Sequence, residues 1–199
     1  MKNVIIVIET IVIVILLVLV SILFLNNATL GDDSLEIEKK WLIKVEDIPY
    51  DLSKADKYEI VQTYLNFSPE MRVRKINNGE FYILTIKSDT PLKGFVREEH
   101  EYIITEEEYN HLLAKQEGNT IYKTRYQLEN EDGLIIAIDI FSGELEGLAY
   151  LEIEFENKDV AEGYEAPKWV IKDVTTDLDY KNGHLSRYGI PSSFYEYMK

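Results

Sequence analysis

Residues 35–43 read LEIEKKWLI, and polar and apolar side chains alternate along them as they do in a half-buried β-strand. Glu36, Glu38 and Lys40 point to one face of this predicted strand, and apolar neighbours such as Ile37 point to the other. One face therefore carries two carboxylates and one ammonium group in close succession. Such a face is either solvated or part of a polar interior.

Charged side chains at alternating positions recur along the chain. Several sets hold a single sign of charge, although a strand face that is simply solvated more often mixes the two signs. Asp139 stands alone among apolar residues in LIIAIDIF, where a buried carboxylate needs a cation, a metal ion or a proton. The other charged positions are Arg72 and Arg74, Lys87, Arg97 with Glu99 and Glu101, Lys123 and Arg125, and Glu152 with Glu154 and Glu156.

The turns predict one antiparallel sheet. Turn signals at 77–79, 131–133 and 142–144 each separate two strand-like runs, and connections this short join antiparallel neighbours. A Thr-x-x-Glu capping box predicts a helix over 106–116, and a second short helix is expected after Pro191.

Closing the sheet into a barrel would gather the charges in one interior and leave the apolar faces to pack against outer helices. The bases would hold a polyanion, because Arg and Lys form charge-assisted hydrogen bonds with phosphate oxygens. The carboxylates would repel one another unless a cation lies between them, and oxygen ligands favour Mg²⁺ or Mn²⁺ over zinc. Together these groups suit phosphoryl chemistry. A solvated outer face is the alternative for any single pair.

Composition narrows the class of protein. The 199 residues, 46% of them hydrophobic, allow one substantial core, and the 14 Tyr and 7 Phe suit β structure. The sequence contains no cysteine, which excludes disulfides and thiolate metal sites. A formal net charge of −15 argues against a nucleic-acid partner, because nucleic acids are bound by neutralising their phosphates with Lys and Arg.

The ordered series of motifs resembles the CYTH superfamily, the triphosphate tunnel metalloenzymes, and within it the bacterial branch with simple triphosphatase activity. The resemblance covers about residues 35–191 and rests on EIEKKWLI, QTYL, RVR, LTIK, RxExEYxI, KTRY, IDIF and GLAYLEIEF in this order. It implies an α+β fold that is mainly antiparallel β, in which an eight-stranded closed β-barrel forms a tunnel with peripheral helices.

The resemblance also implies roles for individual residues. It implies that Glu36, Glu38 and Lys40 are catalytic. It implies that the triphosphate is bound by Arg72, Arg74, Lys87, Arg97, Lys123, Arg125 and Lys181. It implies that Mg²⁺ or Mn²⁺ is bound by Glu36, Glu38, Asp139, Glu152 and Glu154. Asp173 stands where a glutamate is expected, so its role is open.

The expected function is metal-dependent hydrolysis of the terminal phosphate of a triphosphate-containing small molecule, either inorganic triphosphate or a nucleoside triphosphate. The alternatives are an adenylate cyclase of the same fold and a non-catalytic, membrane-tethered module that binds polyphosphate or nucleotide. The sequence leaves open the preferred substrate, the preferred metal and the oligomeric state.

Residues 4–25 form an apolar run long enough to cross a membrane as a helix of roughly 33 Å. A cleaved signal peptide is the alternative, but the run is longer than a usual signal-peptide core. We therefore expect a single-pass anchor over 1–25, a linker over 26–34 and the tunnel domain over 35–199. The charges flanking the run favour a domain outside the cytoplasm, whereas a nucleotide substrate favours the inside, so the side stays open.

Overall fold

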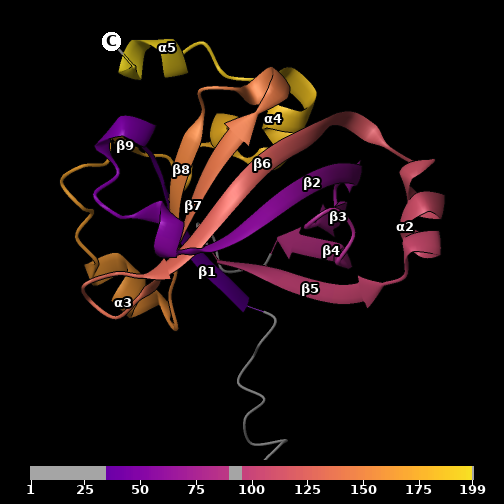
Figure 1. Cartoon of the computed structure of the whole chain (residues 1–199), viewed down its shortest axis with the longest axis horizontal. Coiled ribbons are helices and arrows are strands. Elements are labelled where there is room, and N and C mark those ends of the chain that lie inside the picture. Colours follow the sequence, from indigo (N-terminus) through magenta and orange to yellow (C-terminus); the bar gives the residue numbers. More distant parts are fainter. Residues whose placement is uncertain (1–34, 90–95, 199) are drawn as a thin grey trace, which may run out of the picture. The chain divides into compact units, whose positions relative to one another are not determined.

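The computed structural model describes residues 35–89 and 96–198 (Figure 1). The strands are β1 (Leu35–Leu42), β2 (Asp56–Phe67), β3 (Glu70–Ile76), β4 (Phe81–Asp89), β5 (Val96–Ile104), β6 (Glu117–Glu129), β7 (Ile135–Ser142), β8 (Ala149–Glu154) and β9 (Lys172–Asp173). The α-helices are α2 (Glu106–Leu113), α3 (Lys158–Gly163), α4 (Asn182–Tyr188) and α5 (Phe194–Tyr197). Single 3₁₀ turns are η1 (Val45–Asp47), η2 (Leu52–Lys54), η3 (Gly143–Leu145) and η4 (Leu178–Tyr180).

The described strands form one sheet in the order β5-β4-β3-β2-β6-β7-β8-β1-β9, and every pairing is antiparallel. The three predicted hairpins are confirmed as β3–β4, β6–β7 and β7–β8. The first turns sharply because Asn77 and Asn78 have φ angles of 48° and 63°, a left-handed conformation that Asn tolerates better than other non-glycine residues. The mainly antiparallel character of the fold is therefore as predicted.

The prediction of a closed barrel of eight strands is wrong, both in the number of strands and in the closure. Among the described residues the sheet has nine strands, and the β1–β5 pairing that would close it covers three residue pairs, whereas β4 and β5 pair over eight. The reason lies in β1, which has eight residues and pairs with three strands. Its residues 35–37 pair with β5, its residues 38–42 pair with β8, and its last two residues also pair with β9.

The predicted membrane anchor also needs correction. Within residues 35–89 and 96–198, none of the helices combines the length and the apolar character needed to cross a bilayer. The run over 4–25 on which the prediction depended lies outside the described residues. No described helix therefore supports the predicted transmembrane helix or the predicted membrane localisation.

The apolar face of β1, β7 and β8 packs beneath α3 and the loop that follows it. Trp41, Ile138 and Leu151 are fully buried in this cluster, and the half-buried Tyr164 and Trp169 cover it. A second apolar cluster lies where α2 packs on β3 and β4. The helix predicted from the capping box is confirmed, since Thr105 and Glu108 cap it reciprocally, but it ends at Leu113. These clusters account for the alternate apolar positions of the strands.

The C-terminal segment covers one end of the opposite face of the sheet. Tyr64 and Tyr150 project from β2 and β8 there and are fully buried against Tyr180, Leu185 and Phe194. In Figure 1, α4 and α5 lie beside the upper ends of β6, β7 and β8. The predicted helix after Pro191 is confirmed as α5. This cluster separates one end of that face from water.

Candidate active site

The backbone register places the predicted charged residues on one face of the sheet. A residue paired directly across two antiparallel strands projects to the same side as its partner, so one face can be followed from strand to strand. We call this surface the charged face. Its successive register pairs are Glu38 with Glu154, Lys40 with Glu152, Asp139 with Tyr150 and with Arg125, Gln62 with Arg74, Arg72 with Thr85, Thr85 with Glu101, and Lys87 with Glu99.

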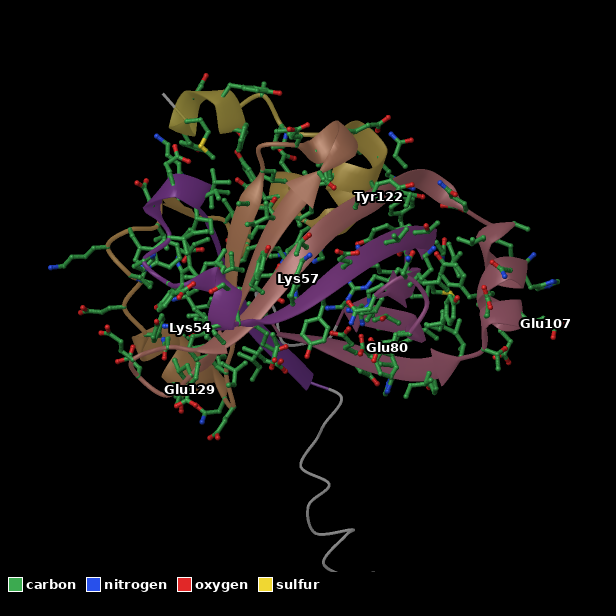
Figure 2. All side chains as sticks on the ribbon, in the orientation of Figure 1. Lys54, Lys57, Glu80, Glu107, Tyr122 and Glu129 are labelled. Atoms are coloured by element: carbon green, nitrogen blue, oxygen red, sulfur yellow. The ribbon has the colours of Figure 1, made fainter. Side chains whose placement is uncertain are left out.

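The charged face is buried and is not the solvated side of a sheet. Lys40 and Glu152 are each 5% exposed, Lys123 is 6% exposed and Asp139 is 0% exposed. Lys57, labelled in Figure 2, projects from the other side of β2 and is exposed. Buried charges at this density persist only when they are paired. The alternative of simple solvation is thereby excluded for these residues.

Asp139 lies against two bases of β6. Its carboxylate accepts hydrogen bonds from Nε and Nη2 of Arg125, at 2.7 and 2.8 Å, and another from Nζ of Lys123. Burial alone would raise the pKa of Asp139, but the charges of Arg125 and Lys123 hold it below its ordinary value. Asp139 is therefore ionised, and β6 supplies the cation that its apolar sequence context requires.

Glu152 lies between a base of β1 and a base of β6. Lys40 Nζ is 2.8 Å from Glu152 Oε1, and Arg125 Nη2 donates to the other carboxylate oxygen. Burial opposes ionisation of Glu152, but Lys40 and Arg125 lower its pKa well below the usual value. Lys40 is also 3.5 Å from Glu38, and Thr175 Oγ1 holds its backbone by accepting from Lys40 N at 3.0 Å. These contacts fix Lys40 on the charged face.

Arg72, Arg74 and Lys87 form a base wall on β3 and β4. Arg72 and Lys87 both contact Glu99, and Arg74 pairs with Glu101. Each of the three bases of the wall therefore contacts a carboxylate of β5, and Arg72 also lies 3.6 Å from Glu70 of β3. The sequence alone assigns no role to Glu99 and Glu101, and the register shows that they lie across from β4.

Two bases, Arg74 and Lys123, have lowered pKa values although each contacts a carboxylate. Burial and the neighbouring Arg72 lower the pKa of Arg74 to about 10, although Glu101 opposes the shift. Burial lowers the pKa of Lys123 to about 8; the carboxylate of Asp139 opposes this shift, and the like charge of Arg125 adds to it. Arg74 Nε is buried and has no hydrogen-bond acceptor among the described residues. A bound anion would give this donor an acceptor and would stabilise both positive charges.

The acids of the charged face have the right chemistry for a hard cation, since all of their donors are carboxylate oxygens. The register sets Glu38 opposite Glu154 and places Glu152 two residues away on the same face. Within the described ranges, however, no three acidic or histidine side chains converge as a metal-binding group. Glu152 and Asp139 instead contact bases. The carboxylate oxygens suit a divalent ion by their chemistry. To bind it, Glu152 and Asp139 would have to exchange their contacts with the bases for contacts with the ion.

For some of the predicted site residues, the structure describes no side-chain contact with the charged face. The backbone register pairs Glu36 with Arg97, but their side chains lie outside the described part, so their roles stay predictions. Lys181 is half-buried at the start of α4, and its role as a phosphate contact is also untested. Asp173 is exposed on β9, where its Oδ1 accepts from Thr175 N at 2.9 Å. This contact supports the turn that holds Lys40.

Sequence reasoning missed several polar residues of the charged face. Gln62 is buried there, and its Nε2 donates to Tyr64 OH at 3.1 Å. Glu70 lies 3.6 Å from Arg72. Gln62 and Tyr64 are in phase with the apolar alternation of β2, so a polar residue within that alternation was the available signal. Thr175 carried no such signal, because it acts from a loop 135 residues away from Lys40.

Comparison with known proteins shows consistent similarities. Residues 34–185 match the family model described as the CYTH domain. The chain is 32% identical over 154 residues to an inorganic triphosphatase of Nitrosomonas europaea, covering 76% of this chain and 96% of that protein. It is 35% identical over 152 residues to an inorganic triphosphatase of Acetivibrio thermocellus, covering 75% of this chain and 92% of that protein. A crystal structure of an inorganic triphosphatase is similar with a TM-score of 0.55 at 31% identity, over 76% of this chain and 93% of that chain.

Proposed function

The chain belongs to the CYTH domain family, and on this premise we propose that it is a triphosphatase, an enzyme that hydrolyses the terminal phosphate of inorganic triphosphate or of a nucleoside triphosphate. The two curated relatives named inorganic triphosphatase support inorganic triphosphate as the first substrate to test.

The observation that carries this proposal is the concentration of buried bases on one face. Each of them projects from a strand, so its position is fixed by the ladder rather than by a loop. A polyphosphate matches this surface because its oxygens accept hydrogen bonds along its whole length. Lys40, Arg72, Lys87 and Lys123 are buried, and Arg74 and Arg125 beside them are half-buried.

The roles of these bases follow from their positions. Arg72, Arg74 and Lys87 would bind the phosphate chain, because they project together from two neighbouring strands. Lys40 and Arg125, which share Glu152, would neutralise the charge that develops on the transferred phosphoryl group. Arg97 and Lys181 are further predicted contacts.

We further propose dependence on a divalent metal ion, Mg²⁺ or Mn²⁺, since metal dependence is typical of the family. Glu38, Glu152 and Glu154 would hold it, with Glu36 and Asp139 as the remaining predicted ligands. When bound, the ion would neutralise phosphate oxygens and acidify a water molecule. In its absence Glu152 serves to hold Lys40 and Arg125 on the charged face.

The test is a phosphate-release assay on the full chain. It compares inorganic triphosphate, ATP, thiamine triphosphate and pyrophosphate, each with Mg²⁺, with Mn²⁺ and with EDTA. We expect triphosphate hydrolysis that requires the metal. Absence of phosphate release from every triphosphate would overturn the proposal, and a cyclic nucleotide as the main product from ATP would reassign the protein as a cyclase.

Two substitutions test whether the charged face is the active site. Glu38→Ala and Arg74→Ala should each lower kcat/KM by roughly 10² or more, because each removes a charge placed at the phosphate. The matched control is Lys57→Ala, since Lys57 is exposed on the opposite face of β2. Equal activity of all three variants would show that the charged face is not the active site.

A further inference from the structure

We propose that Glu99 and Glu101 of β5 are intramolecular competitors for the base wall: they occupy it in the empty protein and weaken anion binding, so that phosphate products can leave. The inference rests on the proposed function, because it assumes that the wall receives the phosphate groups. It adds to that function a device that sets the affinity of the wall.

Glu99 occupies the wall as a bound anion would. Its Oε1 lies 3.3 Å from Arg72 Nη2, and its Oε2 lies 2.7 Å from Lys87 Nζ. One carboxylate therefore bridges two bases from two strands, with one oxygen on each. The exposed fractions of these side chains are 10% for Arg72, 7% for Lys87 and 15% for Glu99, so the contacts are well shielded from solvent.

Glu101 occupies the third base of the wall. It pairs with Arg74, and its Oε1 accepts from Thr85 Oγ1 at 2.9 Å, while Thr85 also accepts from Arg74 Nη2 at 3.2 Å. The side chain of Glu101 is 44% exposed, against 12% for Arg74. Glu101 can therefore turn towards solvent and be rehydrated when an anion takes its place, at little cost in packing.

The backbone makes this occupation a property of the fold. Glu99 is the register partner of Lys87, and Glu101 is the register partner of Thr85. Both acids are thus held directly across from β4, and a phosphate group must displace them in order to reach the bases. The free energy of displacement is subtracted from the free energy of binding for substrate and product alike. An enzyme that must release two anionic products benefits, because tight product binding would limit turnover.

The same strand provides a matched control. Glu98 directly precedes Glu99 in sequence and pairs with Ser88, so it projects to the other side of β5. Its carboxylate contacts His100 at 2.9 Å, and both side chains are 46% exposed. Glu98→Gln therefore removes the same charge from the same strand without emptying the wall.

The experiment measures anion binding to the full chain by calorimetry in EDTA and low salt. The probes are orthophosphate, pyrophosphate and inorganic triphosphate, and the variants are Glu99→Gln, Glu101→Gln and Glu98→Gln. Loss of a carboxylate that contacts the wall should tighten pyrophosphate and triphosphate binding by roughly tenfold or more, given the charge separation. Glu98→Gln should stay within about twofold of wild type, because its charge lies on the far face.

Tighter binding is the decisive sign, because a structural lesion would weaken binding and not strengthen it. Unchanged or weaker binding in both Glu99→Gln and Glu101→Gln would overturn the proposal, as would equal tightening in Glu98→Gln. Since Glu101 is half exposed, its variant keeps the test valid even if Glu99→Gln is unstable. Failure of the wild type to hydrolyse any triphosphate would refute the proposed function instead, and the binding comparison would still decide this one.

Discussion

Replacing Glu152 by glutamine tests how the charged face is held together. The substitution keeps the shape of the side chain but removes the charge that faces Lys40 at 2.8 Å and Arg125 on its other oxygen. Glu152 is 5% exposed, so solvent cannot replace it. Removing one member of a buried ion pair costs about 3–5 kcal/mol, because the remaining buried charges lose a partner: among the described residues, Lys40 then keeps only the more distant Glu38, and Arg125 keeps only Asp139. For a domain of this size the melting temperature should fall by roughly 6–20 °C.

The contribution of Glu152 to the stability of the folded protein should depend on pH. The pKa of Glu152 is lowered in the folded protein, so its contribution to stability is fully present above its unfolded value of 4.5. The contribution is lost as the pH falls below that value towards the depressed folded pKa. The difference in melting temperature between wild type and Glu152→Gln should therefore be widest near pH 7 and should shrink in acid.

The assay is thermal unfolding of the full chain, followed by circular dichroism in EDTA between pH 3 and pH 8. Glu156→Gln is the matched control, because Glu156 is exposed just beyond β8 and its loss should cost no more than about 0.5 kcal/mol. If Glu152→Gln melts as the control does, or if its deficit is independent of pH, then the buried pairs contribute nothing to the stability of the site.

Two further predictions concern single contacts. Lys123, whose pKa is lowered to about 8, loses its charge as the pH rises through that value, so KM for triphosphate should rise above pH 8. Lys123→Arg should flatten this rise, because Arg remains charged; an unchanged profile would remove Lys123 from substrate binding. Thr175→Val should lower the free energy of unfolding by about 1–3 kcal/mol, because it leaves the buried backbone N–H of Lys40 without its acceptor. Thr176→Val, at an exposed neighbour, is the control, and equal denaturant midpoints would contradict the assignment.

The alternation of charged residues predicted the charged face well because it is a local property of each strand. Glu38 and Lys40 needed only the two-residue period of a strand to be assigned to one side of β1, and Glu152 and Glu154 likewise to one side of β8. Asp139 was identifiable because an acid among apolar neighbours must find a cation. The partner of each charge was not predictable, since pairing depends on register between strands that are distant in sequence.

The errors of the sequence prediction have the same physical origin. The barrel prediction rested on gathering the charges in one interior and on the family resemblance, whereas β1 divides its length among β5, β8 and β9. Strand β9 has two residues, and helix α3 has six, so neither is long enough to show a period. Their positions are decided by tertiary packing, which leaves no trace in a short window of sequence.

The division of β1 among several partners also bears on how the protein is made. The ribosome delivers β1 before all the strands that pair with it, and the Thr175 hydroxyl that secures Lys40 is added 135 residues later. A nascent chain cannot complete this part of the fold until synthesis has passed β8 and β9, and such long-range pairing slows folding. A polypeptide stalled before that point would present an unpaired acidic edge, which makes it a candidate for chaperone binding or degradation.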